Sequence, residues 1–496
     1  MKITLISPYP DITAFGLRTI SAYLKSNGFQ THLIFLPDPS GDDLKTGAKR
    51  YDDRALTELI PLCKDSALVG ITLMTNFYDG AVQITEKIKS GVDAPVIWGG
   101  IHATVRPEES LEHADMVCVG EGEEAILELA SRIDRDESFF DVQNIWIKKK
   151  GMILRNPIRR LSENLDKYPN PDYSTEDSHI LDDGHLKILT HHLMKKYLGK
   201  GTVSTYLKMI GYQTMTGRGC PHSCSYCVND TLKKMYGKQN YLRWRSTEHV
   251  LDELIWVKEN LPYIGFIWIS DDAFLARPTK NLEQFCRAYK EKIDLPFMCL
   301  ASPMVVTEEK MELLVTAGLI YLQMGVETGS SKVQELFNRK QMNEERLVQA
   351  FAIINKFKDR MLPPNYDFIV DVPYETDQDK IDSLKLIGRI PKPFHLQLFS
   401  LVPYPGTKIY EMAKKDGLIV DEKRRIYGKS FAVREASYLN FLITLCRNGR
   451  FPGILIRAMI SSVMMHLFNS KPMKPVFKSF YTVLRSTYRM TKKLVS

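Results

Sequence analysis

Apolar and polar positions alternate in blocks along the first 150 residues. Short apolar runs, typical of buried parallel strands, are separated by longer segments in which apolar residues recur with helical spacing. The strand-like runs occur at residues 3–7, 31–36, 68–72, 95–98 and 116–119. The helix-like segments occur at 15–27, 79–90 and 123–132. This alternation predicts a doubly wound parallel sheet, that is, a Rossmann-like α/β domain over residues 1–150.

The periodicity weakens between residues 151 and 211, where turn-forming residues such as those of Tyr168-Pro-Asn-Pro-Asp172 are frequent. We therefore predict a linker over 151–211. Strand–helix alternation resumes over residues 212–418, and this second repeat predicts a partial or full (β/α) barrel. A basic, helical C-terminal extension is predicted over 419–496.

Composition and charge narrow the class of protein. The 496 residues are 44% apolar and 25% charged, which is typical of a globular chain of two or three domains. The net charge of +8 is concentrated at the end, because the sequence from Ala436 onward has ten Lys and Arg residues and no Asp or Glu. The preceding residues are close to neutral, which argues against a nucleic-acid partner.

Three cysteines lie close together in Gly217-Arg-Gly-Cys-Pro-His-Ser-Cys-Ser-Tyr-Cys-Val-Asn-Asp230. The C-x3-C-x2-C spacing of Cys220, Cys224 and Cys227 supplies three thiolates from one loop, enough to bind three irons of a [4Fe-4S] cluster and leave the fourth iron open. Zinc is the alternative, but structural zinc usually takes four protein ligands, and the sequence has no second C-x2-C pair. The spacing therefore favours an iron-sulfur cluster.

The other five cysteines are isolated from one another among apolar neighbours: Cys63, Cys118, Cys286, Cys299 and Cys446. This pattern is typical of buried thiols in a reducing compartment rather than of a disulfide framework. The first residues also lack a signal-peptide pattern. We therefore expect a cytoplasmic protein.

The cysteine motif resembles the signature of the radical S-adenosylmethionine (SAM) superfamily, including the aromatic Tyr226 before the third cysteine. The resemblance implies that the open iron binds SAM, and that one-electron reduction cleaves SAM to a 5'-deoxyadenosyl radical. It also implies anaerobic catalysis and a reducing partner such as flavodoxin or ferredoxin.

Carboxylates follow two predicted strands of the second repeat, in Ser270-Asp-Asp-Ala-Phe274 and in Glu327-Thr-Gly-Ser330. N-capping of the next helix is the structural alternative, and it suits Asp272 in particular. The resemblance instead implies that Glu327 binds the ribose or methionyl end of SAM and that Asp271 faces its amino group.

Two further motifs extend the resemblance to about residues 1–418. The segment Phe368-Ile-Val-Asp-Val-Pro-Tyr-Glu-Thr376 resembles a Gly-x-Pro-Gly-Glu-Thr turn, but Asp371 and Tyr374 replace both glycines. Because those glycines keep the loop small beside the adenine of SAM, we expect a differently shaped adenine pocket. Val402-Pro-Tyr-Pro-Gly-Thr407 resembles the superfamily's pattern at the last core strand, with no residue replaced.

Three turns after predicted strands of the first domain indicate a second cofactor site: Ser7-Pro-Tyr-Pro10, Gly99-Gly-Ile-His-Ala-Thr104 and Gly120-Glu-Gly-Glu123. Glycines at such strand ends let a ligand approach the backbone closely. In this order the turns resemble the cobalamin-binding domain found upstream of many radical SAM cores. The resemblance implies that cobalamin is contacted by Gly99, Gly100, His102, Gly120, Glu121 and Gly122.

The first domain departs from cobalamin domains that coordinate cobalt through a histidine. Their Asp-x-His-x-x-Gly motif does not occur after the first strand. His102 lies in a glycine turn, where hydrogen bonding is the alternative to metal ligation. We therefore predict that cobalamin binds without a protein histidine ligand.

The C-terminal extension leaves two interpretations open. Residues 453–468 are apolar apart from one arginine, one histidine and two serines, and they are fewer than the ~20 residues of a membrane span. An amphipathic helix there, followed by Lys471, Lys474 and Lys478, suits peripheral contact with an anionic inner membrane surface. Alternatively, its apolar face packs on the barrel and covers the substrate cavity.

Together these features predict a cobalamin-dependent radical SAM enzyme that methylates an unactivated carbon of a small-molecule or lipid-like substrate. Radical cyclisation, or another carbon-skeleton oxidation with the same cofactors, is the enzymatic alternative. A methylthiotransferase is disfavoured because the first domain lacks a cysteine triplet. A non-catalytic iron-sulfur or cobalamin protein that transfers electrons or acts as a sensor is the alternative from another class.

Overall fold

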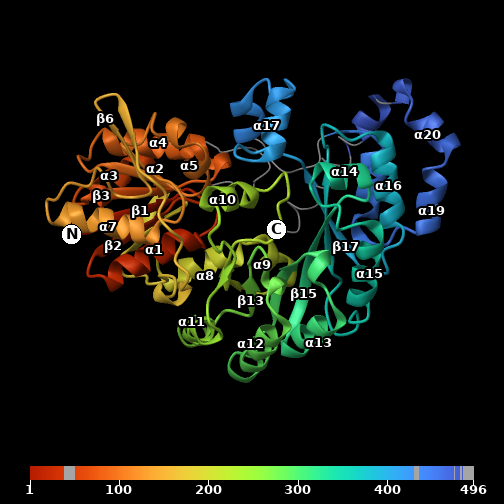
Figure 1. Ribbon diagram of the computed structural model, residues 1–496, viewed down its shortest axis with the longest axis horizontal. Helices are drawn as coiled ribbons and strands as arrows, with labels where there is room; N and C mark the ends of the chain where they lie inside the picture. Colours follow the sequence, from red (N-terminus) through yellow and green to blue (C-terminus); the bar gives the residue numbers. More distant parts are fainter. Residues whose placement is uncertain (38–50, 429–434, 474, 481–482, 484–496) are drawn as a thin grey trace. The chain divides into compact units, whose positions relative to one another are not determined.

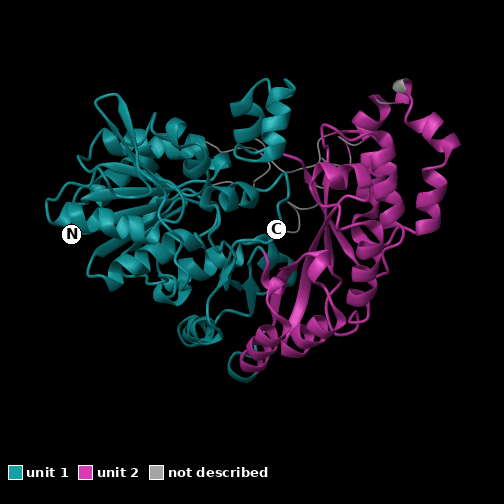
Figure 2. Ribbon diagram, in the orientation of Figure 1, with its two compact units in different colours: residues 1–272, 291–295, 403–430 teal, residues 273–290, 296–402, 431–496 magenta. Residues whose placement is uncertain are grey.

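The computed structural model describes residues 1–37, 51–428, 435–473, 475–480 and 483. The chain divides into two compact units (Figure 2). Unit 1 contains residues 1–272, 291–295 and 403–430, and unit 2 contains residues 273–290, 296–402 and 431–496. Unit 1 thus includes a segment that follows the last strand of unit 2 in the sequence, and we call its described residues, 403–428, the return segment.

Unit 1 is built on a sheet that has nine strands within the described residues, in the order β7-β6-β5-β4-β3-β1-β2-β8-β9. The strands from β5 to β8 in that order are parallel, whereas β6, β7 and β9 are antiparallel to their neighbours. The central strands are continuous apolar runs, because parallel strands are covered on both faces. Their bounds are Lys2–Ser7 (β1), Gln30–Phe35 (β2), Leu68–Thr72 (β3), Val96–Gly99 (β4) and Met116–Cys118 (β5).

Helices cover both faces of this sheet (Figure 1). On one face α1 (Phe15–Ser26) contacts α7 (Glu123–Asp134), and on the other lie α4 (Tyr78–Lys89) and α5 (Ile101–Val105). The strand order reverses at β1, since β2 and β3 lie on opposite sides of it. Ligands of doubly wound sheets bind at the carboxyl edge beside such a reversal. The predicted Rossmann-like fold is therefore confirmed.

The predicted linker contains more regular structure than its sequence indicates. Strands β6 (Ile145–Lys149) and β7 (Met152–Arg155) extend one edge of the sheet, and β8 (Ser178–Asp182) and β9 (His185–Ile188) extend the other. Most residues of β7 and β9 are exposed or half-buried. Short edge strands bury little apolar surface, so they lack the apolar run that identifies a central strand. The predicted boundaries at residues 150 and 211 stay predictions.

The remainder of unit 1 carries the cysteine motif. Strand β10 (Gly211–Thr214) pairs in parallel with β13 (Phe266–Ile269). Strands β11 (Gly217–Arg218) and β12 (Arg243–Trp244) form an antiparallel pair. The helices of this part are α8 (His191–Gly199), α9 (Thr202–Leu207), α10 (Asn229–Tyr236), α11 (Thr247–Asn260) and α17 (Lys408–Lys415).

Unit 2 follows the β/α repeat predicted for a radical SAM barrel. Four parallel strands, β14 (Phe297–Ala301), β15 (Leu319–Glu327), β16 (Asn365–Val370) and β17 (His395–Ser400), pair in chain order. The connecting helices are α13 (Glu308–Ala317), α14 (Ser331–Leu336), α15 (Glu344–Asn355) and α16 (Asp377–Ile387). The predicted fold class, with a barrel-like core, is therefore confirmed.

The C-terminal extension is helical, as predicted. Its helices in unit 2 are α18 (Tyr438–Leu445), α19 (Gly453–Met459) and α20 (Ser462–Phe468). Among the described residues, no helix is both long enough and apolar enough to cross a membrane. Five basic residues of the tail lie outside the described residues: Lys474, Arg485, Arg489, Lys492 and Lys493.

Candidate active site

The three cysteines of the motif lie on the loop between β11 and α10, which we call the cysteine loop (residues 219–228). None of the three forms a disulfide within the described structure, and Cys224 is buried whereas Cys220 and Cys227 are half-buried. Burial raises the pKa of Cys220 to about 11, and neighbouring Cys227 and Cys224 also oppose its ionisation. Binding a metal reverses this preference, because metal ligands are thiolates.

The three thiols of the loop match the protein ligands of a [4Fe-4S] cluster. No group of three or more His, Cys, Asp or Glu side chains in the described part of the chain is arranged to hold one metal ion. In a [4Fe-4S] cluster each thiolate binds a different iron, so the three cysteines need not converge on one point. The predicted Tyr226 is half-buried in the same loop.

Two parts of unit 1 hold the cysteine loop in place. Gly219 has a φ of 87°, and a Cβ atom there would collide with the carbonyl group of Tyr241. On the other side the return segment contacts the loop and the helix after it: the Ile409 N–H donates to the Ser225 carbonyl at 2.9 Å, and the Thr231 hydroxyl donates to the Gly406 carbonyl. Gly406 of the Val402–Thr407 motif therefore supports α10, and Ile409, just after the motif, supports the cysteine loop.

The two aspartates after β13 have different surroundings. Asp271 is 2% exposed, and its two oxygens accept hydrogen bonds from the Thr216 N–H and hydroxyl, each at 2.5 Å. Asp272 is exposed, and its Oδ2 accepts a hydrogen bond from Asn229 at 3.1 Å. The next α-helix, α12 (Thr279–Lys292), begins well after Asp272, so N-capping of that helix does not explain this residue. The predicted SAM contact of Asp271 stays a prediction, and Asp272 is the aspartate nearer to the cysteine loop through Asn229.

Glu327 ends β15 in unit 2 in a strained conformation. Its φ is 71°, and the pairing with β16 shifts register between Gly325 and Glu327. Its Oε1 lies 4.0 Å from Nη1 of Arg339. Burial and the charge of Glu327 raise the pKa of Asp367 well above its usual range. A non-glycine residue held at positive φ at a strand end is a feature of functional sites, and it accords with the predicted role of Glu327.

In the turn after β16, Asp371 stands where the resembling turn has a glycine, and its backbone has a conformation typical of glycine. Asp371 has a φ of 58°, in the left-handed region that favours glycine. Its Oδ1 accepts a hydrogen bond at 2.7 Å from the side-chain amide of Asn440, on α18. The aspartate thus adds a contact with the C-terminal extension that a glycine cannot make.

In the first domain, β4 ends in the predicted Gly99-Gly100 turn. A Cβ atom on Gly100, which has a φ of 92°, would collide with the Leu73 backbone, so this glycine lets two strand ends meet. A Cβ atom on Gly99 would meet nothing closer than 3.9 Å, so its backbone is open to a ligand. Met74 and Ile101, which sequence reasoning missed, follow these strands and are 40% and 38% exposed. An apolar, glycine-lined strand edge of this kind fits the flat ring of a corrinoid.

His102 is fully buried, and its ring is enclosed by other side chains of unit 1. Its Nδ1 lies 3.1 Å from the Thr75 hydroxyl, and the rings of Tyr78 and Tyr427 pack against it. Burial lowers the pKa of His102 to about 3, so the ring is neutral. Its Nε2 has no hydrogen-bond partner within the described structure and lies 4.0 Å from Oε2 of Glu109. These contacts support a structural role for His102.

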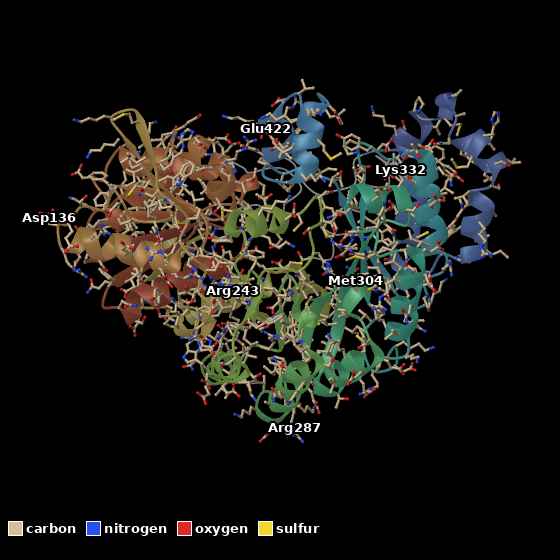
Figure 3. All side chains as sticks on the ribbon, viewed as in Figure 1. Asp136, Arg243, Arg287, Met304, Lys332 and Glu422 are labelled. Carbon is tan, nitrogen blue, oxygen red and sulfur yellow. The ribbon has the colours of Figure 1, made fainter. Side chains whose placement is uncertain are left out.

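The Gly120–Glu123 turn binds the strands beside the cysteine loop. Arg243, labelled in Figure 3, binds the carboxylate of Glu121. Arg218 contacts both Glu121, at 3.1 Å, and Glu123, at 2.5 Å. Although burial opposes the ionisation of Glu123, Arg218 and Arg243 hold its pKa below the usual range. The carboxylate of Glu121 therefore pairs with two arginines. The predicted contact of Glu121 with cobalamin stays a prediction.

The backbone of the same turn contacts α10. The Glu121 N–H donates to the hydroxyl of Tyr236 at 2.9 Å, and a Cβ atom on Gly120 would collide with that hydroxyl. Gly122 packs on α1, where a Cβ atom would lie 3.1 Å from Ile20. Such contacts leave no local sequence signal, because their partners are far apart in the chain.

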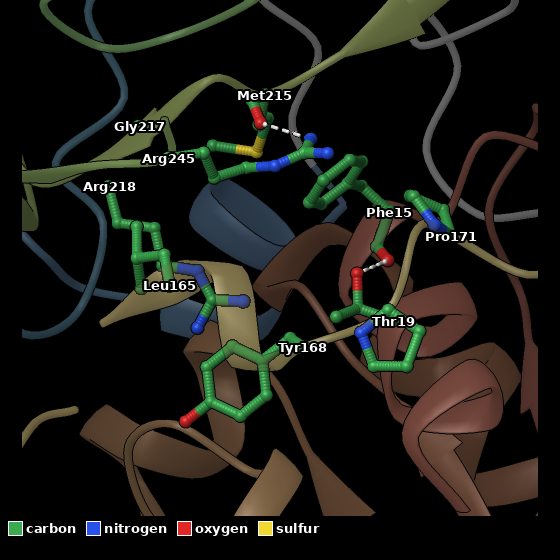
Figure 4. Close-up of a pocket in the computed structure, with 10 residues that line it drawn as sticks. Phe15, Thr19, Leu165, Tyr168, Pro171, Met215, Gly217, Arg218 and Arg245 are labelled. Atoms are coloured by element: carbon green, nitrogen blue, oxygen red, sulfur yellow. Dashed lines mark hydrogen bonds between the residues drawn. The ribbon is translucent and has the colours of Figure 1, made fainter. Parts of the chain in front are cut away.

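A small pocket opens at the start of α1, lined by Phe15, Thr19, Met215, Arg218 and Arg245 among others (Figure 4). Arg245 donates to the Met215 carbonyl at 3.2 Å. Its guanidinium is also paired with Glu253, so this pocket offers no free charge to a ligand.

Comparison with known families agrees with the two modules. Residues 1–130 match the B12 binding domain family, and residues 214–387 match the radical SAM superfamily. An uncharacterised methyltransferase of Pyrococcus horikoshii is 25% identical over 445 residues, which are 86% of each chain. The anaerobic magnesium-protoporphyrin IX monomethyl ester cyclase of Rubrivivax gelatinosus is 24% identical over 79% of this chain and 64% of its own. A bacteriochlorophyllide d C-8(2)-methyltransferase of Chlorobaculum tepidum is 23% identical over 72% of this chain and 70% of its own.

Solved structures share the fold. The cobalamin-dependent SAM radical enzyme OxsB, with aqua-cobalamin and SAM bound, has a TM-score of 0.65 at 16% identity, over 98% of this chain and 71% of its own. The radical SAM methyltransferase TsrM of Kitasatospora setae, with cobalamin and a [4Fe-4S] cluster bound, has a TM-score of 0.64 at 17% identity, over 84% and 78%. With both modules matched and the cysteine motif on its loop, the chain carries a radical SAM domain at residues 214–387 and an N-terminal cobalamin (B12)-binding domain at residues 1–130.

Proposed function

We propose that this protein transfers a methyl group to an unactivated carbon of an apolar small molecule. The observation that carries the proposal is the set of bonds in unit 1 between the cobalamin-binding domain and the strands beside the cysteine loop: Glu121 and Glu123 bind Arg218 and Arg243. A chain that fixes these two modules together is suited to using both cofactors on one substrate. The methyltransferase relatives from Pyrococcus and Chlorobaculum support methyl transfer as the outcome.

Each module supplies one part of the chemistry. When bound, the cluster with SAM supplies a hydrogen-abstracting radical, and cobalamin supplies a transferable methyl group. In this proposal Cys220, Cys224 and Cys227 bind the cluster, and the SAM contacts predicted for Asp271 and for Glu327 stay predictions. The open backbone at Gly99 and the exposed side chains of Met74 and Ile101 hold the corrinoid ring.

We propose further that no protein histidine binds cobalt. His102 is enclosed by Tyr78, Tyr427 and Thr75, and a ligating nitrogen would have to leave this surrounding. Electron paramagnetic resonance of the cob(II)alamin form should therefore show no superhyperfine splitting from a protein nitrogen. The control is the same protein expressed with ¹⁵N-labelled histidine. A splitting that changes with this label would contradict the proposal.

The reaction is tested with reconstituted protein under anaerobic conditions. The protein is given SAM, dithionite, methylcobalamin with a deuterated methyl group, and a total lipid and metabolite extract. We expect 5'-deoxyadenosine together with a metabolite that carries the deuterated methyl group. A product with a new ring and no label would instead support the cyclase alternative, which the Rubrivivax relative resembles. Absence of 5'-deoxyadenosine would contradict enzymatic activity and favour an electron-transfer or sensor protein.

The electron that cleaves SAM has to come from another protein, and we propose flavodoxin or ferredoxin for this role. Replacing dithionite with either donor and its reductase should support 5'-deoxyadenosine formation. Formation with dithionite but with neither protein would contradict this assignment.

We propose that the C-terminal extension contacts an anionic membrane surface. Ile454, Val463 and Leu467 are 77%, 73% and 54% exposed, and Arg450 and Arg457 accompany them on a segment without acidic residues. Exposed apolar side chains with cationic neighbours suit binding to anionic lipid. The full chain should float with phosphatidylglycerol vesicles and less with phosphatidylcholine vesicles.

Substitutions distinguish specific binding by this surface from nonspecific hydrophobic binding to vesicles. The double variant Ile454→Ser and Val463→Ser should lose flotation. Val420→Ser removes an 80% exposed apolar residue that precedes the stretch without acidic residues and stands beside Asp421 and Glu422, and this variant should float like the unaltered protein. Equal flotation of all three proteins would contradict the proposal.

A further inference from the structure

Asn229 is the first residue of α10 and lies two positions after the third cysteine. Its side-chain amide nitrogen lies 3.6 Å from the sulfur of Cys227, a hydrogen-bond contact for sulfur. The same nitrogen lies 3.1 Å from Oδ2 of Asp272.

The orientation of the amide is set by its partners. The hydroxyl of Tyr241 donates to Oδ1 of Asn229 at 2.7 Å. The opposite orientation would turn the amide oxygen toward a carboxylate and a sulfur, which are both acceptors. The amide therefore directs one N–H to Asp272 and the other to Cys227.

Tyr241 is itself held by its surroundings. Its side chain is 9% exposed, and its ring stacks on that of Tyr236 with the centroids 6.2 Å apart. Both rings belong to a small apolar core with Leu161. The backbone carbonyl of Tyr241 meets Gly219, so the same residue fits against both ends of the cysteine loop. Tyr241 thus fixes Asn229 against Cys227.

From this arrangement we propose that Asn229 raises the reduction potential of the cluster. A hydrogen bond to a ligating sulfur withdraws charge from the cluster and favours its reduced form, and hydrogen bonds to sulfurs are a known determinant of such potentials. Asn229 is the donor, and Tyr241 is a positioning residue that acts through it. Asp272 has the opposite electrostatic effect, because its negative charge disfavours added electrons.

The proposal rests on the cluster and not on methyl transfer, so it can be tested without the substrate. The potential of the [4Fe-4S]2+/+ couple is measured by redox titration monitored by electron paramagnetic resonance, in full-length protein with matched iron and sulfide content. We expect Asn229→Leu to lower the equilibrium constant for reduction about tenfold, a negative shift of about 59 mV for a one-electron couple. Tyr241→Phe should shift the potential in the same direction by less, because Asp272 still holds the amide.

A matched control is Asn260→Leu, which makes the same substitution at an exposed position of α11. It should leave the potential unchanged. A second readout is the coupling of an exchangeable proton to the reduced cluster, measured by electron-nuclear double resonance in H₂O and D₂O. One such coupling should be lost in Asn229→Leu and kept in Asn260→Leu.

Two outcomes would overturn the proposal. One is an equal potential in the unaltered protein, Asn229→Leu and Tyr241→Phe. The other is a positive shift in either variant. If Asn229→Leu fails to assemble a cluster, Tyr241→Phe decides the question, since it removes only one oxygen. Absence of 5'-deoxyadenosine or of methylation in the unaltered protein would bear on the proposed function alone, because the potentials of the three proteins are compared without substrate.

Discussion

Arg243 lies directly opposite Arg218 on the β11–β12 pair, and both guanidinium groups bind the Gly120–Glu123 turn of the cobalamin-binding domain. Two cations side by side repel each other, so they need the carboxylates of Glu121 and Glu123. Arg243 is 2% exposed, and its Nε has no hydrogen-bond partner within the described structure. The junction of the two modules is therefore a buried charge network.

Replacing Arg243 with Met should destabilise the protein. The substitution leaves Glu121 with only its contact to Arg218, and breaking a buried ion pair typically costs about 3 to 5 kcal/mol. We expect about 2 to 3 kcal/mol here, because Glu121 is partly exposed. Chemical unfolding measures the change, with Arg360→Met as the control. Arg360 and Glu312 form an exposed ion pair that contributes little to stability, so equal losses in both variants would contradict the prediction.

Replacing Gly219 with Ala should abolish cluster binding while leaving most of the fold intact. A left-handed backbone costs an alanine about 1 kcal/mol, and the added methyl group also collides with the Tyr241 carbonyl, which displaces the cysteine loop. Gly237→Ala is the control, since Gly237 also has a positive φ but has nothing within 4 Å of its Cβ position. Iron analysis after reconstitution compares the two. Normal iron content in Gly219→Ala would show that the loop tolerates the displacement.

Protonation of His102 should weaken the fold at acidic pH. Its folded-state pKa of about 3 lies below the unfolded value of about 6.5, so the unfolded chain binds the proton more readily between these values. The contribution of His102 to the free energy of unfolding is therefore complete above a pH of about 6.5. It is lost at up to about 1.4 kcal/mol per pH unit as the pH falls toward 3. Unfolding of the unaltered protein and of His102→Gln is compared at about pH 7 and about pH 5, above and below the unfolded pKa. The stability difference between them should shrink at the lower pH, and a constant difference would be contrary evidence.

Substitutions at Asp371 should separate its backbone role from its contact with Asn440. The Asp371→Asn variant tolerates the left-handed conformation and can still accept from Asn440, so the free energy of unfolding should change by less than about 0.5 kcal/mol. Asp371→Gly relieves strain but leaves the buried Asn440 amide without this acceptor, a cost of about 1 kcal/mol. Asp371→Ala loses the acceptor and also strains the backbone, so it should cost about 2 kcal/mol. Any other order of the three variants would refute this division of roles.

The sequence predicts the parts of the fold that have a local pattern. The strands from β1 to β5 are continuous apolar runs, and three closely spaced cysteines are recognisable without any structure. The edge strands β7 and β9 escape prediction because they are mostly exposed or half-buried.

The contacts of the site are harder to predict, because they join residues that are distant in the sequence. Glu121 lies in a glycine turn that resembles a cofactor-binding turn, yet its carboxylate pairs with Arg243, more than a hundred positions later. Met74 and Ile101 are ordinary apolar residues in the sequence, and only their exposure at adjacent strand ends singles them out. Asn229 gains its role from Tyr241 and Asp272, which no spacing rule brings together.

The return segment has a consequence for how the enzyme matures. Ile409 and Gly406 support Ser225 and Thr231, although they follow them by well over a hundred residues and come after the whole of the β14–β17 repeat. A ribosome releases the cysteines long before it releases these partners, so the loop is incomplete while the chain is still being synthesised. Iron and sulfide supplied at that stage would meet three thiols without their supporting backbone. Cluster insertion should therefore be a late, post-translational event in the life of this protein.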